Sequence, residues 1–400
     1  MNNLDGIDDT NPATFRPPPS PKPPKRARLE NIPKRNHHRH AKRRDKRNTA
    51  PQTPRPATLR DCVSDGVAIH ATLDAFTLPT THGAYAAKAE DSRSKYGHKK
   101  RRTLSELIAL GFRVVKWDGI EARPIVDAHD RVIAVLAGRP RDPTYVQAVS
   151  DVFNAMLLER KNAHFPGSLN KHRRGSFPAL NAGLSYSKGQ RVPSRLDGGE
   201  YALLLQRLLG DPNVNRMAVY ASAAFALWAP KVHRYYQEHD DALHRKMPDL
   251  GRNFAKSVFS CAAFNFGPKV CTFKHRDILN VPFGWCAVTA MGEFDHRTGG
   301  HLVLWDLELV VEFPHAATIL LPSATIAHSN IPVGVDEMRG SFTQYTPGGL
   351  IRYVDNGFRT EGELQEEDPA EYARLLALKA TRWDMGISLL STVEELLEAL

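Results

Sequence analysis

The sequence predicts an α+β protein in which helices flank a core of short β-strands, with a disordered basic tail before both. Residues 61–258 are predicted to be mixed α/β and then helical, whereas short apolar segments recur about every ten residues from Phe259 onward. Turn signals such as Gly267-Pro268 and Pro347-Gly348-Gly349 separate these segments. This rhythm is typical of an all-β sandwich or a jelly roll.

The tail is defined by its charge. Residues 1–60 hold 15 Lys/Arg against 5 Asp/Glu, so this segment carries the whole net charge of +10 of the 400-residue chain. It also holds 11 of the 28 prolines and few large apolar residues, and we therefore expect it to be disordered. Basic clusters such as Lys42-Arg43-Arg44 are typical of a nuclear-import signal or a phosphate-binding arm, although such a tail can also be merely solubilising.

Other features of the sequence indicate an intracellular protein whose cysteines are reduced. The first residues, Met1-Asn2-Asn3-Leu4-Asp5, lack the apolar region of a signal peptide. The longest apolar stretch, about Met217 to Pro230, is too short to span a bilayer, so we expect no membrane association. The four cysteines show no CxxC spacing, which argues against a zinc ribbon or a disulfide framework. The basic tail favours the nucleus as the location.

Helices and a small β element are expected between residues 61 and 258. A helix is predicted over Leu104 to Leu110, and Phe112 to Trp117 and Arg131 to Ala137 are predicted to form a small antiparallel element. Capping signals and apolar periodicity predict three further helices: one after Asp142-Pro143, one over Glu200 to Leu209, and a long one from Asp211-Pro212 to about Tyr236.

Strands and two closing helices are expected from residue 259 to the C-terminus. The predicted strands cover Phe259 to Phe266, Cys286 to Met291, His301 to Phe313, Thr318 to Leu321, Arg339 to Tyr345 and Leu350 to Val354. One closing helix begins at Asp368-Pro369 and the other at Ser391, where Ser391-x-x-Glu394 forms a capping box. The predicted parts of the chain are a tail (1–60), an α/β and helical part (61–258), a strand-rich core (259–358) and C-terminal helices (359–400).

The segment Phe273-Lys274-His275-Arg276-Asp277-Ile278-Leu279-Asn280 contains the residue types of a metal site. Because residues two apart on an extended chain point to the same side, His275 and Asp277 can present an imidazole and a carboxylate to one point. A second imidazole is available at His328, just past a buried-looking strand. Two His and one carboxylate on one face of a metal form the triad of non-heme Fe(II) oxygenases, so these three residues are the predicted catalytic iron ligands.

An HxD tripeptide alone is weak evidence, because it is expected by chance in a chain with 17 His. Arg339 makes the prediction more specific. It opens the predicted strand Arg339 to Tyr345, beyond His328 in the sequence. A guanidinium on an inner strand can hold a carboxylate with two parallel hydrogen bonds, which suits the far end of a 2-oxoglutarate chelated to iron. The order HxD, His, Arg across short strands is that of 2-oxoglutarate/Fe(II) dioxygenases on a double-stranded β-helix.

Three segments resemble the catalytic core of the TET/JBP family of nucleic-acid base dioxygenases, and the chain looks most like the compact fungal members. These segments are His275 to Asn280, Gly300 to Leu304 and Arg339 to Tyr345, and the resemblance covers about Phe259 to Phe358. It implies the same three iron ligands that the residue types suggest. The animal enzymes carry a base-contacting His two residues after the Tyr that corresponds to Tyr345, where this chain has Pro347, and their cysteine-rich zinc domain is absent here.

The resemblance also implies roles for residues around the metal. Arg339 and Ser341 would hold the distal carboxylate of 2-oxoglutarate, and His301 would be a further contact to it. Asn280 matches a position that contacts the flipped base, and Tyr345 matches one that stacks near it. A lone histidine such as His301 can equally be structural, and Asn280 can simply cap a turn.

Together these observations predict a nuclear oxidoreductase that uses Fe(II), 2-oxoglutarate and O2 to hydroxylate the methyl group of 5-methylcytosine in DNA. The target base would be flipped out of the duplex into the pocket, and the basic tail would contact DNA. Two alternatives remain: a dioxygenase of the same fold acting on thymine, RNA or protein, and a non-enzymatic DNA-binding protein with a degenerate core. The oligomeric state and the preferred base sequence are not predicted.

Overall fold

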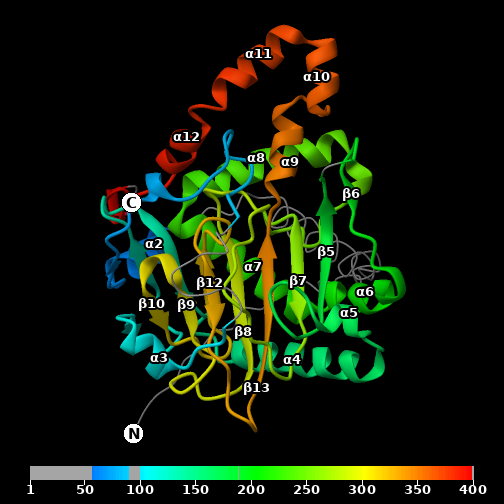
Figure 1. Cartoon of the computed structure of the whole chain (residues 1–400). Coiled ribbons are helices and arrows are strands. Elements are labelled where there is room, and N and C mark those ends of the chain that lie inside the picture. Colours follow the sequence, from blue (N-terminus) through cyan, green and yellow to red (C-terminus); the bar gives the residue numbers. More distant parts are fainter. Residues whose placement is uncertain (1–55, 90–99, 188, 399–400) are drawn as a thin grey trace, which may run out of the picture. The chain divides into compact units, whose positions relative to one another are not determined.

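The computed structural model describes residues 56–89, 100–187 and 189–398 as an α+β structure with two sheets (Figure 1). The predicted α+β class is therefore confirmed. The prediction for the tail falls almost entirely outside the described residues. Within the described residues, no helix combines the length and the apolar character needed to cross a membrane.

The helices of the described chain lie before, between and after the strands. Their bounds are α2 Pro56–Ser64, α3 Leu104–Ala109, α4 Thr144–Asn162, α5 Gly167–Asn170, α6 Ala202–Gly210, α7 Pro212–Trp228, α8 Pro230–Lys246, α9 Gly348–Asp355, α10 Glu361–Glu367, α11 Pro369–Leu378, α12 Arg382–Ser388 and α13 Val393–Glu398. A short 3-10 turn, η4, covers Trp305–Leu307.

The strands form one nine-stranded and one four-stranded sheet. Their bounds are β1 Ile69–His70, β2 Arg113–Val115, β3 Arg123–Val126, β4 Val132–Gly138, β5 Ala179–Ser185, β6 Ser194–Arg195, β7 Cys261–Asn265, β8 Cys286–Glu293, β9 Leu302–Leu304, β10 Leu309–Val311, β11 Thr318–Leu321, β12 His328–Asn330 and β13 Met338–Tyr345. The large sheet has the order β1-β3-β4-β11-β8-β13-β7-β5-β6, and the small sheet has the order β12-β9-β10-β2.

Helices cover one face of the large sheet. Apolar side chains of α4, α6 and α7 pack against those of β5, β7 and β13 in one buried cluster, which includes Phe153, Phe264 and Phe342. On the small sheet, Val303 and Val310 pack with Leu107 of α3 in a separate cluster. A further buried apolar cluster contains residues of both sheets, among them Leu304 of β9 and Ile319 of β11.

Strand β13 separates core from site by its alternation, since successive side chains point to opposite faces of a sheet. Phe342 packs on Phe264, and Nε2 of Gln344 donates a hydrogen bond of 3.2 Å to the carbonyl of Ala218 in α7. Every second residue from Arg339 to Tyr345 therefore points away from the helices. One strand thus packs the core with one face and carries predicted site residues on the other.

The segment Leu350 to Val354, predicted as a strand, lies instead in helix α9. Pro347 precedes the helix with an extended backbone, at φ −64° and ψ 131°, so the triplet that suggested a turn is the start of the helix. Leu350, Ile351 and Tyr353 are buried on its inner face. A five-residue apolar run does not distinguish a strand from a buried helix, which explains the wrong prediction.

The predicted pairing of Phe112 to Trp117 with Arg131 to Ala137 is also wrong. Strand β2, from the first segment, runs parallel to β10 in the small sheet, whereas β4, from the second, pairs antiparallel with β3 in the large sheet. Strand β3 contains Pro124 and has only four residues, which concealed it in the sequence. Residues before 259 therefore extend both sheets.

The single strand predicted over His301 to Phe313 is wrong, since η4 divides it into β9 and β10, and helices α10 and α12 accompany the two predicted closing helices. Two predicted helix boundaries also differ. The long helix expected from Asp211 to about Tyr236 is divided at Ala229, because Pro230 lacks an N–H and starts α8 after α7 has ended at Trp228. The predicted start is correct, since Asp211 accepts a hydrogen bond of 2.7 Å from the backbone N–H of Asn213. In the last helix, Thr392 rather than Ser391 accepts the capping bond, from the N–H of Glu395 at 3.1 Å.

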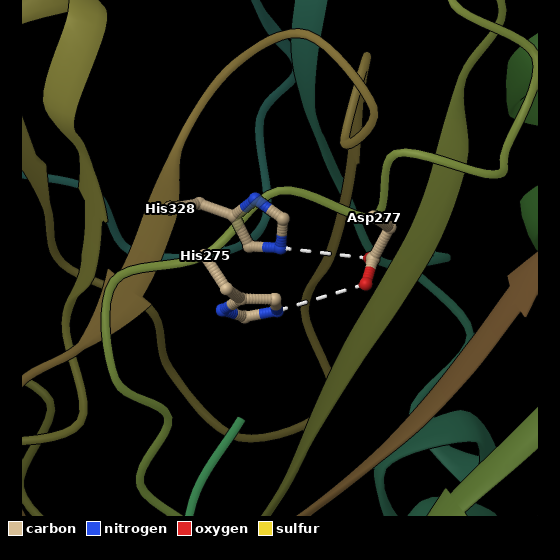
Figure 2. A group of neighbouring side chains, drawn as sticks. All are labelled: His275, Asp277 and His328. Carbon is tan, nitrogen blue, oxygen red and sulfur yellow. Dashed lines mark ion pairs between the residues drawn. The ribbon is translucent and has the colours of Figure 1, made fainter. Parts of the chain in front are cut away.

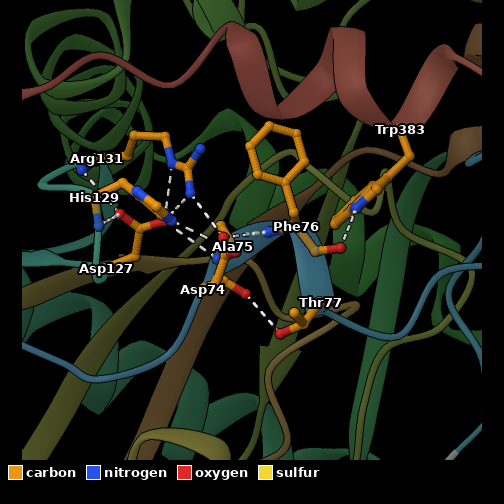
Figure 3. A network of polar contacts seen from close by, with 8 residues as sticks. All are labelled: Asp74, Ala75, Phe76, Thr77, Asp127, His129, Arg131 and Trp383. Atoms are coloured by element: carbon orange, nitrogen blue, oxygen red, sulfur yellow. Dashed lines mark hydrogen bonds and ion pairs between the residues drawn. The ribbon is translucent and has the colours of Figure 1, made fainter.

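A buried carboxylate organises the chain around β3 and β4 (Figure 3). Asp127 is 1% exposed and accepts backbone hydrogen bonds from Ala75, His129 and Arg131, at 3.2, 2.9 and 3.0 Å. The Arg131 guanidinium donates two more bonds to it and lies 4.5 Å from the centroid of the Phe76 ring. Asp127 therefore fixes the loop of residues 74–77 to the turn between the two strands.

We expect Asp127→Ala to lower the free energy of unfolding by about 2–3 kcal/mol, because it leaves three backbone N–H groups without this acceptor and the Arg131 guanidinium with Asp74 as its remaining carboxylate. Urea-induced unfolding monitored by circular dichroism measures this change. His129→Ala is the matched control, since His129 bonds to Asp127 only through its backbone and its side chain is largely exposed. Equal, small losses in both variants would contradict the assignment.

Candidate active site

His275, Asp277 and His328 lie together as the sequence predicts (Figure 2). Nε2 of His275 is 3.8 Å from Oδ1 of Asp277, and Nε2 of His328 is 3.8 Å from Oδ2 of the same carboxylate. Candidate ligand atoms of all three residues lie within 4.8 Å of one another. Among the described residues, no other group of three or more His, Cys, Asp and Glu side chains meets this criterion.

Backbone pairing brings the three candidate ligands together from separate parts of the chain. The N–H of His275 donates to the carbonyl of His328 at 3.1 Å, and the reverse bond is 2.9 Å long. This antiparallel bridge places His275 beside β12, at the edge of the small sheet. Asp277 follows two residues later, and its N–H donates to the carbonyl of Ser323 at 2.9 Å. The three side chains therefore converge on one point because two extended segments are paired.

Each imidazole is oriented by a backbone carbonyl. Nδ1 of His275 lies 2.8 Å from the carbonyl oxygen of Phe273, and Nδ1 of His328 lies 3.0 Å from that of Ile326. A carbonyl can only accept, so Nδ1 carries the proton in both rings. In the neutral form of each ring, Nε2 then keeps its lone pair and faces Asp277, which is the tautomer that a metal requires.

The protonation states of His275 and Asp277 suit a divalent cation. Burial, followed by the proximity of a second imidazole, His328, lowers the pKa of His275 to about 3, so this ring is neutral at pH 7. Burial opposes the charge on Asp277, but neighbouring groups, the Arg174 guanidinium among them, outweigh burial and hold the pKa of this carboxyl below its ordinary value. A neutral imidazole and an ionised carboxylate are the forms in which these side chains bind metals.

Arg339 is buried on the site face of β13. It is 1% exposed, and it makes no ion pair with a carboxylate among the described residues. Its Nη1 donates a hydrogen bond of 3.2 Å to the carbonyl of Val270, whereas its Nε has no partner there. Burial lowers the pKa of Arg339 to about 10, which leaves it protonated at neutral pH. A buried cation of this kind is costly unless an anion joins it.

Other buried polar atoms near Arg339 also lack partners. His301 is fully buried, and neither of its ring nitrogens has a hydrogen-bond partner among the described residues. Asn265 donates through Nδ2 to Oγ of Ser341 at 2.9 Å, but its Oδ1 is unpartnered. A Cβ on Gly300, the residue before His301, would lie 3.3 Å from Cδ of Arg339, so the two regions are in contact. The unpartnered Nε–H of Arg339 and the ring N–H of His301 are donors that fit a carboxylate such as those of 2-oxoglutarate, whereas Oδ1 of Asn265 is an acceptor and does not.

A cavity of about 490 Å³ opens beside Asp277. Asn280 and Tyr345, the two residues expected to meet the substrate, both line it, together with Asp277 itself. Ser341, Arg339 and His301 are buried instead and are not among the residues that line this cavity. The structure thus places the predicted substrate residues and the predicted cosubstrate residues in different parts of the site.

Asp306, in the turn η4, is a residue that the sequence did not single out. Its Oδ1 accepts a hydrogen bond of 2.7 Å from Nη2 of Arg276, which stands between the candidate ligands His275 and Asp277. Its Oδ2 accepts a bond of 2.6 Å from the N–H of Ala327, the residue before the candidate ligand His328. One carboxylate therefore ties both ligand-bearing segments together. No sequence signal marks it, because its partners are far from it in the chain.

Comparisons with known proteins give a consistent but distant likeness. No protein-family model matches the sequence, and a comparison with curated proteins finds no match either. The chain is similar to the solved structure of NgTET1 in complex with 5mC DNA, with 13% identity and a TM-score of 0.44 over 62% of this chain and 89% of that one. It is also similar to a 2OG-Fe(II) oxygenase family oxidoreductase from Burkholderia pseudomallei, with 16% identity and a TM-score of 0.25 over 42% and 68%.

Identities and TM-scores this low do not establish a shared activity, so function has to be inferred from the side chains. The two imidazoles and one carboxylate fit Fe(II), and the unpartnered donor of Arg339 fits a carboxylate of 2-oxoglutarate. Three protein ligands would leave room at the metal for this cosubstrate and for O2.

We expect Asp306→Ala to weaken divalent-metal binding by about 10–100-fold, since partners that orient metal ligands contribute on this scale. Titration with Co(II), followed by its visible absorption, measures affinity separately from folding. Asp241→Ala removes a half-exposed carboxylate that pairs with Arg252 and serves as the control. Unchanged Co(II) affinity in Asp306→Ala would show that the carboxylate does not position the ligands.

Proposed function

We propose that the protein is an Fe(II)/2-oxoglutarate-dependent dioxygenase that hydroxylates the methyl group of 5-methylcytosine in DNA. The observation that carries the proposal is the coexistence of a His-Asp-His cluster with a buried arginine that has no carboxylate partner among the described residues. Iron accounts for the cluster, and a 2-oxoglutarate carboxylate accounts for Arg339. A degenerate core without enzymatic activity would not need both the His-Asp-His cluster and the buried arginine.

We assign the two sheets to a double-stranded β-helix. Four neighbouring strands of the large sheet have the order β11-β8-β13-β7, and three of the small sheet have the order β12-β9-β10, with antiparallel pairing throughout. The segment at His275 adds a further antiparallel bridge to β12. Two facing sheets of four segments each form a jelly roll. We propose residues 259–358 as its core, which the strands before residue 259 extend.

In the proposed reaction the iron centre supplies the oxidation, and residues of the chain bind and orient the reactants. Iron with 2-oxoglutarate and O2 supplies the oxidation: one oxygen atom enters a substrate C–H bond as hydroxyl, and the other enters succinate as CO2 leaves. His275, Asp277 and His328 would hold the metal. Arg339 would orient the distal carboxylate with charge-assisted hydrogen bonds, and Ser341 would add a hydroxyl. The buried surroundings keep bulk water away from the reacting atoms.

Asn280 supports a cytosine rather than a thymine substrate. Its Nδ2 donates a hydrogen bond of 3.1 Å to Oγ of Ser323, which leaves Oδ1 as the atom available to a ligand in the cavity. This oxygen is an acceptor. It suits the amino group of 5-methylcytosine, whereas thymine presents a carbonyl at the same ring position. Tyr345 would offer a stacking face to the base.

The proposal extends to partner and location. A methyl group inside a duplex is out of reach of a cavity, so the nucleotide would be flipped out of the stack. The basic segment of residues 1–60 would act as a DNA-contacting arm, a nuclear-import signal or both, and we propose the nucleus as the location.

Arg339→Ala should raise the KM for 2-oxoglutarate at least about tenfold and leave Co(II) affinity unchanged, because it removes charge-assisted bonds to the cosubstrate but no metal ligand. Succinate formation measured against 2-oxoglutarate concentration gives the KM. Ser341→Ala, which removes one hydroxyl, should have a smaller effect. An unchanged KM in Arg339→Ala would show that the arginine serves another purpose.

The substrate is tested by incubating the protein with matched duplexes that contain either 5-methylcytosine or thymine, followed by mass spectrometry of the nucleosides. We expect 5-hydroxymethylcytosine from the first duplex and little product from the second. Asn280→Asp keeps an acceptor and should retain this preference, whereas Asn280→Ala should lose activity. The variant His275→Ala is the negative control. Preferential oxidation of thymine would overturn the substrate while leaving the metal site intact.

A further inference from the structure

The cavity beside Asp277 has a basic wall that the chemistry of the metal site does not need. Its charged lining residues are Arg173, Arg174, Arg276 and Asp277. A smaller cavity of about 200 Å³ shares Arg173 and Arg174 with it and has no acidic residue in its lining. Arginines therefore line both cavities, and the single carboxylate is the proposed iron ligand.

The ion pairs of these arginines show which of them are available to a ligand. Arg276 is committed to Asp306, at 2.7 Å. The nearest carboxylate to Arg174 is Asp277, at 3.7 Å. A divalent cation bound by Asp277 would neutralise this carboxylate and leave Arg174 without a counter-charge. Arg173 is exposed and donates only to a neutral group, the backbone carbonyl of Arg276, at 3.3 Å; it forms no ion pair within the described part of the chain. The positive charges of Arg173 and Arg174 are thus not fully balanced by carboxylates of the described residues.

These two arginines are held in place by a tight turn. The N–H of His172 donates to the carbonyl of Gly175 at 3.0 Å, and the reverse bond is 3.1 Å long, so Arg173 and Arg174 are the two central residues. The ring of His172 contacts the carbonyl of Phe177 at 2.9 Å. A Cβ on Gly175 would lie 2.8 Å from the carbonyl oxygen of Cys271, so this position requires glycine. The turn is a preorganised support for two charges.

The turn is also attached to the segment that carries the proposed ligands. The N–H of Phe273, two residues before His275, donates to the carbonyl of Arg174 at 2.8 Å, and Gly175 forms an antiparallel bridge with Thr272. A ligand bound by Arg173 and Arg174 would therefore be positioned directly relative to the metal. A pair of solvated surface arginines would not require such an attachment.

We infer that the turn of residues 172–175 is a phosphate-binding element that grips the nucleic-acid backbone next to the flipped nucleotide. Guanidinium groups match the geometry of phosphate oxygens, and phosphate contacts fix the register of the nucleic acid without reading its sequence. The inference rests on the proposed action on DNA. The inference distinguishes a nucleic-acid substrate from a protein substrate, because only a nucleic acid carries a phosphate anion at every nucleotide.

A double-mutant cycle between protein and DNA tests this contact. The DNA is a 5-methylcytosine duplex in which one phosphate at a time, on either side of the target base, is replaced by an uncharged methylphosphonate. Affinities of the full-length protein are measured by fluorescence anisotropy at one salt concentration. Arg207→Ala is the control, because it changes the net charge equally but removes an arginine that pairs with Glu159 on the protein surface.

We expect one flanking methylphosphonate to weaken wild-type binding by roughly three- to tenfold and to have less than about a twofold effect in Arg173→Ala, because the partner is already gone. Arg207→Ala should respond as the wild type does. Equal responses of wild type and Arg173→Ala at every flanking phosphate would overturn the inference. This readout is binding alone, so coupling without any oxidised nucleoside would refute the proposed reaction and leave the phosphate contact standing.

Discussion

The site depends on the backbone pairing of His275 with His328. These residues are far apart in the chain, and two hydrogen bonds between their main-chain groups place both imidazoles beside Asp277. Main-chain pairing fixes position independently of what the side chains bind, so the ligands are arranged before a metal arrives. Asp306 adds a side-chain connection between the same two segments.

A second constraint is the charge buried within the fold. Arg339 and His301 are enclosed with atoms that find no partner among the described residues, which costs stability in the absence of a ligand. Such a cost is typical of functional sites, where the ligand completes the hydrogen bonds. The alternation of β13 makes this arrangement possible, since its other face contributes Phe342 to the packed core.

The sequence predicted the grouping of the candidate metal ligands better than the surrounding architecture. Residue types and their order are enough to single out His275, Asp277 and His328, which the structure brings together, because few side chains bind Fe(II). Strand Thr318–Leu321 was also predicted with its observed bounds, since turn signals isolate it. The strand predicted over Leu350 to Val354 is wrong because a short apolar run suits either a helix or a strand. Asp306 and Asn265 could not be found, as their roles depend on contacts between distant parts of the chain.

The most direct test of the account is whether the purified protein, supplied with Fe(II) and O2, converts 2-oxoglutarate into succinate in a manner that depends on methylated DNA. The account predicts succinate in amounts matching the oxidised base when the 5-methylcytosine duplex is present, and little succinate with an unmethylated duplex of the same sequence. A protein that binds Fe(II) and the duplex but forms no succinate above the level of its His275→Ala variant would contradict it.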